Sequence, residues 1–239
     1  MDVTQLRPTG EKYKLYTGSY AEAMPQLIAD GRRPATIEDV VNARNETFPE
    51  ISAIFGSDTK ELMKMRDIET RYGTNQLNAL FFWANYFHTV DGFYRKRLVL
   101  SPPDLLNANP NCGLKDGGLM AADPESLIVL SADDTITKIG KDTMGKSVSD
   151  IFWSTPRQEK YSKWYFAMRG NSSSLNRYTL NVMELVKFLE YNGAQTMEIH
   201  PPISDDLMPV VVKSVLKGSS LYGSNPMDKA NARLIGIKE

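Results

Sequence analysis

The segment that most constrains the fold of this chain is residues 77–87, its densest apolar stretch. The stretch carries five aromatic side chains: Phe81, Phe82, Trp83, Tyr86 and Phe87. On a helix they would surround the axis almost completely, which is typical of an element buried on most sides. We therefore predict a helix over residues 77–87 at the centre of the core.

The composition indicates an ordinary globular protein. The 239 residues include 28 basic and 29 acidic side chains and are 41% hydrophobic, enough for one large domain or two small ones. The near-zero net charge argues against a strongly basic nucleic-acid coat protein, and the aromatic content argues against disorder.

The chain contains few of the residues that form disulfides and zinc sites. One cysteine and two histidines provide neither an internal disulfide nor a Cys/His zinc framework. The first residues lack the pattern of a secretory signal, and no apolar run approaches the roughly 20 residues that span a bilayer. We expect a cytoplasmic protein with no membrane segment.

Residues 1–100 are predicted to be rich in helix. Ser19 precedes an apolar-periodic stretch that Gly31 would end, and Thr36 with Asp39 resembles a capping box at the start of a second helix. A third helix is predicted to begin at residue 57 or 58.

Residues 101–126 are crowded with Pro, Gly and Asn, a composition typical of a loop or linker. Residues 127–239 are predicted to form a mixed α/β portion. Its expected elements are a hairpin over 127–139, strands over 161–168, 197–200 and 232–238, and helices over 175–191 and 207–216. The resulting fold class is α+β with a small sheet, in separate portions or in one compact domain.

One motif matches a phosphate-binding loop in full. Residues 140–147 contain Gly140, Gly145, Lys146 and Ser147 in the spacing that cradles phosphates and ligates magnesium. The context is poorer, because the preceding residues alternate like a hairpin strand rather than forming a continuous apolar run. Binding or hydrolysis of ATP or GTP with Mg²⁺ is therefore an alternative function, and an ordinary solvated turn is the competing interpretation.

Two further pairs could carry chemistry. His88 precedes Asp91 by three residues, so on a continuing helix both would share a face and could form a general base. The alternative is a histidine packed near a helix C-terminus. Glu198 and His200 alternate onto one side of a predicted strand and could bind a metal, although the following Ser204 and acids also fit a helix start.

Binding residues are proposed from aromatic and cationic side chains. Arg32, Trp83 and Tyr86, with the tyrosines of residues 13–20, could form an aromatic recognition surface. The clusters at residues 32–33 and 95–97 could contact phosphates, or could be solvated surface charge. A nucleic-acid-binding module in the mildly basic C-terminal portion is a further alternative.

Four segments resemble a family of uncharacterised prokaryotic, largely archaeal, proteins. They are YKLYTGSY at 13–20, GRRPAT at 31–36, VVNAR at 40–44 and WANYFHTVD at 83–91. That family has no assigned activity, so the resemblance implies a prokaryotic cytoplasmic setting and no catalytic residues. The leading hypothesis is a ligand- or macromolecule-binding protein rather than an enzyme.

Overall fold

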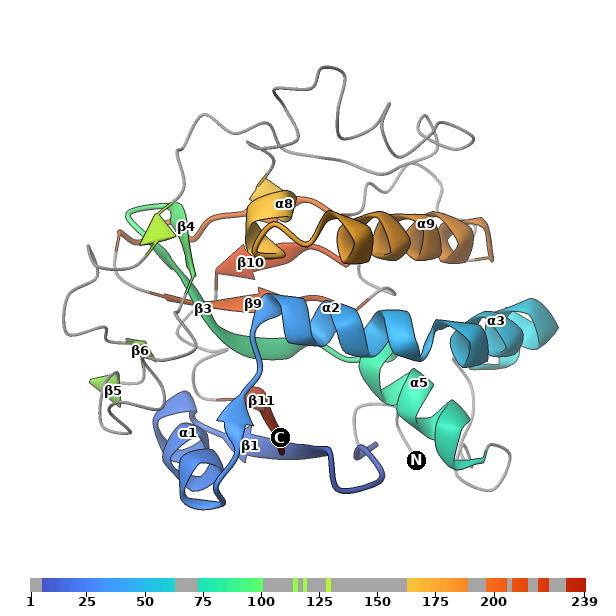
Figure 1. Ribbon diagram of the computed structural model, residues 1–239, viewed down its shortest axis with the longest axis horizontal. Coiled ribbons are helices and arrows are strands. Elements are labelled where there is room, and N and C mark those ends of the chain that lie inside the picture. Colours follow the sequence, from blue (N-terminus) through green and yellow to red (C-terminus); the bar gives the residue numbers. More distant parts are fainter. Residues whose placement is uncertain are drawn as a thin grey trace.

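The protein is described by a computed structural model in which a mixed nine-stranded sheet is flanked by helices (Figure 1). The structure describes residues 6–62, 73–100, 163–188, 197–205, 208–214, 219–223 and 231–239, and three short strand segments between residues 114 and 129. The α+β class predicted from the sequence is confirmed.

Strands from both halves of the chain are neighbours in the main sheet, whose order is β1-β11-β3-β9-β10-β8. Strands β2, β4 and β7 extend it from β11, β3 and β4, and β5 pairs with β6 alone. Their bounds are β1 Tyr13–Gly18, β2 Arg33–Pro34, β3 Phe87–Tyr94, β4 Arg97–Leu100, β5 Leu114–Lys115, β6 Gly118–Leu119, β7 Ile128–Val129, β8 Ile199–His200, β9 Met208–Val212, β10 Leu221–Gly223 and β11 Ala232–Ile237. The first hundred residues are therefore not merely helical, because they supply the central strand β3.

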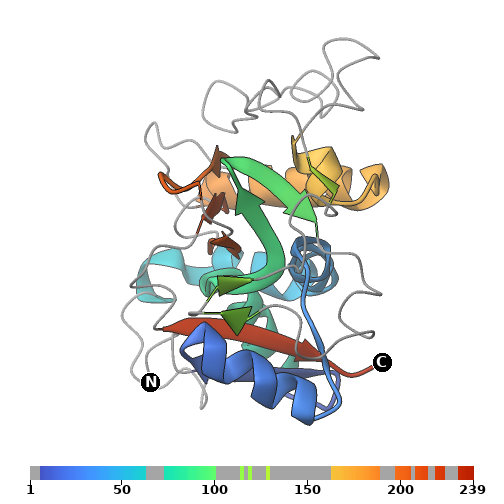
Figure 2. The same cartoon turned by 90° about the vertical axis from the view of Figure 1, so that its left-hand side faces the viewer.

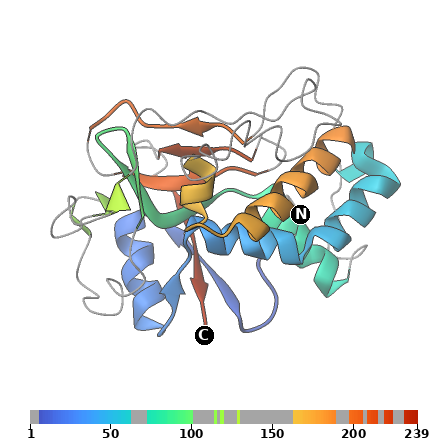
Figure 3. The same cartoon turned by 45° about the horizontal axis from the view of Figure 1, so that its top comes forward.

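The helices are α1 Tyr20–Ala29, α2 Ile37–Glu46, α3 Phe48–Leu62, α5 Thr74–Ala84, α8 Lys163–Ala167 and α9 Ser172–Phe188. Helix α2 packs on β3 and β9, and α9 packs across α2 and α3 (Figure 3). Helix α1 packs instead on β1 and β11.

Strand β11 separates two apolar clusters. Ile235 and Ile237 belong to the main core beneath the helices, whereas Ala232 and Leu234 belong to a second cluster built with α1. Because successive side chains of a strand point to opposite faces, both faces of β11 are covered, which explains why all six of its residues are buried.

Two helix starts follow the sequence prediction closely. The Ser19 side chain accepts from the Glu22 backbone N–H, and the Glu22 carboxylate accepts from the Ser19 N–H. Thr36 and Asp39 make the same reciprocal pair at α2. Each capping box satisfies backbone donors that would otherwise lack a partner.

The helix predicted over residues 77–87 is confirmed as far as Ala84 and is wrong in its last three residues. Helix α5 ends at Ala84, Asn85 is extended, and Phe87 begins strand β3. Residues 86–90 are aromatic or β-branched apart from His88, and such residues suit a strand buried between neighbours. Figure 2 shows β3 curving through the centre of the molecule. The pairing of β3 with β9 has a register shift between His88 and Gly92.

Three further elements differ from the predictions, two in their type and one in its first residue. The expected strand over 161–168 is helix α8, in which Trp164 and Ala167 face the core one turn apart. The expected helix over 207–216 is strand β9, because three successive valines favour a strand and Pro209 pairs beside the bulge of β3. Helix α3 begins at Phe48, well before residue 57.

The helix predicted over 175–191 is confirmed by α9 as far as Phe188, and residues 189–191 lie outside the described residues. The strand over 232–238 is confirmed by β11 as far as Ile237, and the strand over 197–200 is confirmed in its last two residues as β8. The hairpin predicted over 127–139 lies outside the described residues except for β7. Most of the linker over 101–126 also lies outside them, so the division of the chain there stays a prediction.

Candidate functional site

The candidate pair His88 and Asp91 lies on strand β3, and both side chains are fully buried. The prediction that they share one face of a helix is therefore wrong. His88 Nδ1 accepts from the Arg233 backbone N–H at 3.2 Å, and its ring lies near Tyr20 and Tyr86. Asp91 is directed toward the start of α2.

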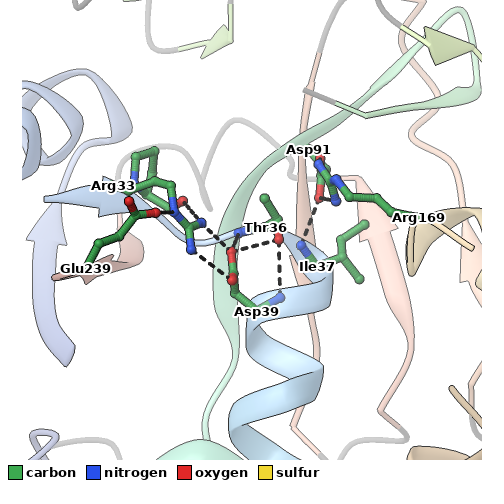
Figure 4. Close-up of polar contacts among 8 residues, drawn as sticks. Arg33, Thr36, Ile37, Asp39, Asp91, Arg169 and Glu239 are labelled. Carbon is green, nitrogen blue, oxygen red and sulfur yellow. Dashed lines mark hydrogen bonds and ion pairs between the residues drawn. The ribbon is translucent and has the colours of Figure 1, made fainter. Parts of the chain in front are cut away.

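Asp91 occupies the amino end of α2. The Ile37 N–H donates to Asp91 Oδ2 at 2.8 Å, and Arg169 donates to both carboxylate oxygens at 2.8 and 3.3 Å (Figure 4). A helix N-terminus favours negative charge, so Asp91 fills the position that an anion would otherwise take. Burial alone would lower the pKa of Arg169, but the Asp91 carboxylate outweighs it and raises that pKa above its ordinary value.

A second ion pair lies beside the first turn of α2. Arg33 donates to both oxygens of Asp39, at 2.6 and 3.1 Å, and to Glu239 at 3.0 Å. Burial raises the pKa of Asp39, but hydrogen bonds from Arg33 and Thr36 lower it by a larger amount. The pKa of Asp39 therefore lies below its ordinary value. The two carboxylates hold α2, β2, β3 and the turn after α8 together, which is a structural role.

Arg44 is a fully buried charge that the sequence analysis did not single out as a site. Its guanidinium donates to the carbonyls of Phe82, Asn85 and Lys213 and to the Tyr178 hydroxyl, at 2.7 to 3.2 Å. Phe82 is in the last turn of α5, whose carbonyls have no partners within the helix. Arg44 thus caps α5 at the point where the chain turns into β3. Its position four residues after Val40, on the apolar face of α2, was the available sequence signal.

The proposed aromatic surface is not assembled. Trp83 is fully buried and its Nε1 donates to the Arg44 carbonyl at 2.9 Å, so it cannot line a surface. Arg32 donates to the backbone carbonyls of Glu11, Lys12 and Gly236. Tyr86 is half-buried, with the Arg233 guanidinium 5.9 Å from its ring centre.

Glu198 and His200 are brought together as predicted. Glu198 Oε2 lies 2.9 Å from His200 Nε2 at a partly exposed position. Within the described ranges, however, no three His, Cys, Asp or Glu side chains are grouped to hold a metal. The pair has the geometry of a surface ion pair.

Within the described residues, the turn between β3 and β4, residues 94–97, combines an exposed position with a left-handed backbone. We call it the basic turn. Arg95 and Lys96 have φ values of 47° and 63°, and Tyr94 pairs with Arg97. Positive φ at both central residues is the signature of a type I′ hairpin turn, which favours Asn-Gly. Arg95, Lys96 and Arg97 are all exposed, and the Arg95 guanidinium lies 5.1 Å from the Tyr94 ring centre.

A second loop lies against the basic turn. The Arg95 N–H donates to the Asp205 carbonyl at 3.0 Å, which joins the turn to residues 201–205, the segment after β8. In Figures 1 and 3 this segment (orange) runs beside the β3–β4 hairpin (green). Ile203 within it is 97% exposed, so cationic and apolar side chains are presented at one edge of the molecule.

The phosphate-loop motif at residues 140–147 lies outside the described residues, and nucleotide binding there stays a prediction. In the part of the chain that the structure covers, no helix has the length and hydropathy to cross a bilayer.

No protein-family model, curated protein or solved structure matches the chain. The resemblance to an archaeal family therefore stays a prediction, and function has to be argued from the geometry.

Proposed function

We propose that this protein binds nucleic acid through the basic turn. The observation that carries the proposal is the left-handed backbone at two successive non-glycine residues, Arg95 and Lys96. Strain of this kind at an exposed position calls for a functional explanation.

The backbone conformation of Arg95 and Lys96 lowers the stability of the fold. A left-handed conformation costs an L-residue roughly 1–2 kcal/mol, and Asn-Gly would adopt this turn with less strain. Arg95 and Lys96 are exposed, so burial of their side chains does not offset that cost. Their long cationic side chains are suited to an interaction with another molecule.

The chemistry of the turn favours a polyanion. It presents three successive cations, at residues 95–97, on a rigid two-stranded support. Arg and Lys contacts to phosphates provide most of the sequence-independent affinity for nucleic acids. Because the whole chain carries a net charge of −1, attraction to a polyanion has to come from a local cluster of this kind.

The test is the salt dependence of binding to a fluorescent DNA duplex, measured by anisotropy. Three phosphate contacts predict a slope of log K against log salt of about −2.7, or roughly a 40-fold loss of affinity between about 50 and 200 mM salt. Replacing Arg95, Lys96 and Arg97 together by Gln should abolish that slope while retaining the fold, because the three side chains are exposed.

The matched control removes the same charge elsewhere. Lys12, Lys14 and Lys238 are exposed lysines that pair with surface acids around β1, and replacing all three by Gln should leave the slope unchanged. Equal weakening by the two triple variants would mean that net charge, and not the basic turn, determines binding. Absence of binding by the unaltered protein at low salt would overturn the proposal.

A further inference from the structure

We infer that Ile203 is an apolar wedge that enters between two base pairs of duplex DNA from the minor groove while the basic turn contacts the flanking phosphates. This inference rests on the proposed function and adds to it the class of nucleic acid and the mode of contact. The juxtaposition that motivates it is an almost fully exposed isoleucine two residues before Asp205, whose backbone carbonyl accepts a hydrogen bond from the basic turn.

The position of Ile203 is fixed by the residues around it. It follows Pro201 and Pro202, which restrict the backbone of the loop. Pro202 packs so closely on β10 that a Cβ added to Gly223 would lie 2.4 Å from its ring. The Arg95 N–H holds the other end of the loop at Asp205. A loop held at both ends loses little conformational entropy on binding.

The side chain and its neighbours match a known mode of DNA contact. Proteins that bind the minor groove insert apolar wedges, isoleucine among them, between base steps and hold the flanking backbone with Arg and Lys. Ile203 is 97% exposed, whereas Leu180 on α9, the other large exposed hydrophobic residue of the described regions, is 53% exposed.

The same elements resemble a surface for anionic membranes, but a single isoleucine provides little apolar area. Stable anchoring at a bilayer needs a long apolar helix face or two lipid-binding signals. Insertion between two bases requires only one side chain, so we assign Ile203 to DNA and make membrane binding an outcome of the test.

The experiment uses a duplex that carries a fluorescein at one end and 2-aminopurine in the site, so that anisotropy reports binding and 2-aminopurine fluorescence reports unstacking. The unaltered protein should bind and increase the 2-aminopurine signal. Ile203→Ala should retain the salt slope, abolish the increase in signal and weaken binding by roughly 50-fold, as expected from the loss of three buried carbon groups. Leu180→Ala is the matched control and should behave like the unaltered protein.

The outcomes separate the inference from the proposed function. Binding without an increase in 2-aminopurine fluorescence, or an equal increase with Ile203→Ala, overturns the wedge and leaves the basic turn as the binding site. Absence of binding overturns both. Tighter binding to phosphatidylserine vesicles than to the duplex, lost in Ile203→Ala, would also overturn the inference in favour of a membrane surface.

Discussion

At the scale of single residues, buried charges connect elements that are far apart in the sequence. Arg44 links α2, α5 and α9, and Asp91 links β3, α2 and the turn after α8. A buried charge is tolerated when hydrogen bonds or an opposite charge replace its hydration. These side chains therefore specify how the helices lie on the sheet.

The Asp91 and Arg169 pair should contribute measurably to stability. Asp91→Asn removes the charge that Arg169 faces, and we expect a loss of about 2–4 kcal/mol in the free energy of unfolding. Urea denaturation of Asp91→Asn, Arg169→Met and the double variant gives the coupling energy. We expect the double variant to be more stable than the sum of the single effects predicts, and additivity within about 0.5 kcal/mol would show that the pair is not coupled.

The sequence revealed parts of this network but not its geometry. Asp91 was recognised as a candidate with His88, but as a catalytic partner on a helix. Its contacts with Ile37 and Arg169 join residues 54 and 78 positions apart, and no local pattern reports such distances. The exposed cluster at 95–97 was visible in the sequence, whereas its left-handed backbone was not.

At the scale of elements, the sequence predicts the helix starts that depend on neighbouring residues, but it does not predict the strand whose partners lie far along the chain. The capping boxes at Ser19 and Thr36 join residues three positions apart. Thr36 with Asp39 predicts the start of α2, and Ser19 before an apolar-periodic stretch predicts the start of α1. Residues 87–94 form strand β3 because β11 and β9 lie on either side of it. That environment is contributed by residues more than a hundred positions later, so helical periodicity alone misassigned the segment.

Two glycines in different elements should respond to alanine in opposite directions. In β11, a Cβ on Gly236 would lie 2.8 Å from the Tyr16 ring and 3.0 Å from Leu27, so Gly236→Ala should destabilise the fold by about 1–3 kcal/mol. In α3, a Cβ on Gly56 meets nothing within 4 Å, so Gly56→Ala should stabilise it by up to about 1 kcal/mol. Urea denaturation measures both. A Gly236→Ala variant that is not destabilised would contradict the packing assigned to β11, and a destabilised Gly56→Ala variant would contradict the open position assigned to α3.

At the scale of the whole molecule, the arrangement of the sheet places the proposed binding surface. Strand β3 is held between β11 and β9 and covered by α2, so its far end projects the basic turn from a rigid centre. The loop at 201–205 reaches the same edge because β8 belongs to that sheet. Residues from both halves of the chain thus form one surface. The sequence of either half alone does not predict that surface.

The most direct test of this account exchanges the two strained residues for those that the turn prefers, Arg95→Asn with Lys96→Gly. The account predicts opposite changes in two properties of one variant. The melting temperature should rise by about 2–4 °C for each kcal/mol of strain relieved, and the salt slope for duplex binding should become shallower by about 1.8, the value for two phosphate contacts. A variant that binds as tightly as the unaltered protein, or that melts at a lower temperature, would contradict the claim that this turn keeps its cations for binding at the expense of stability.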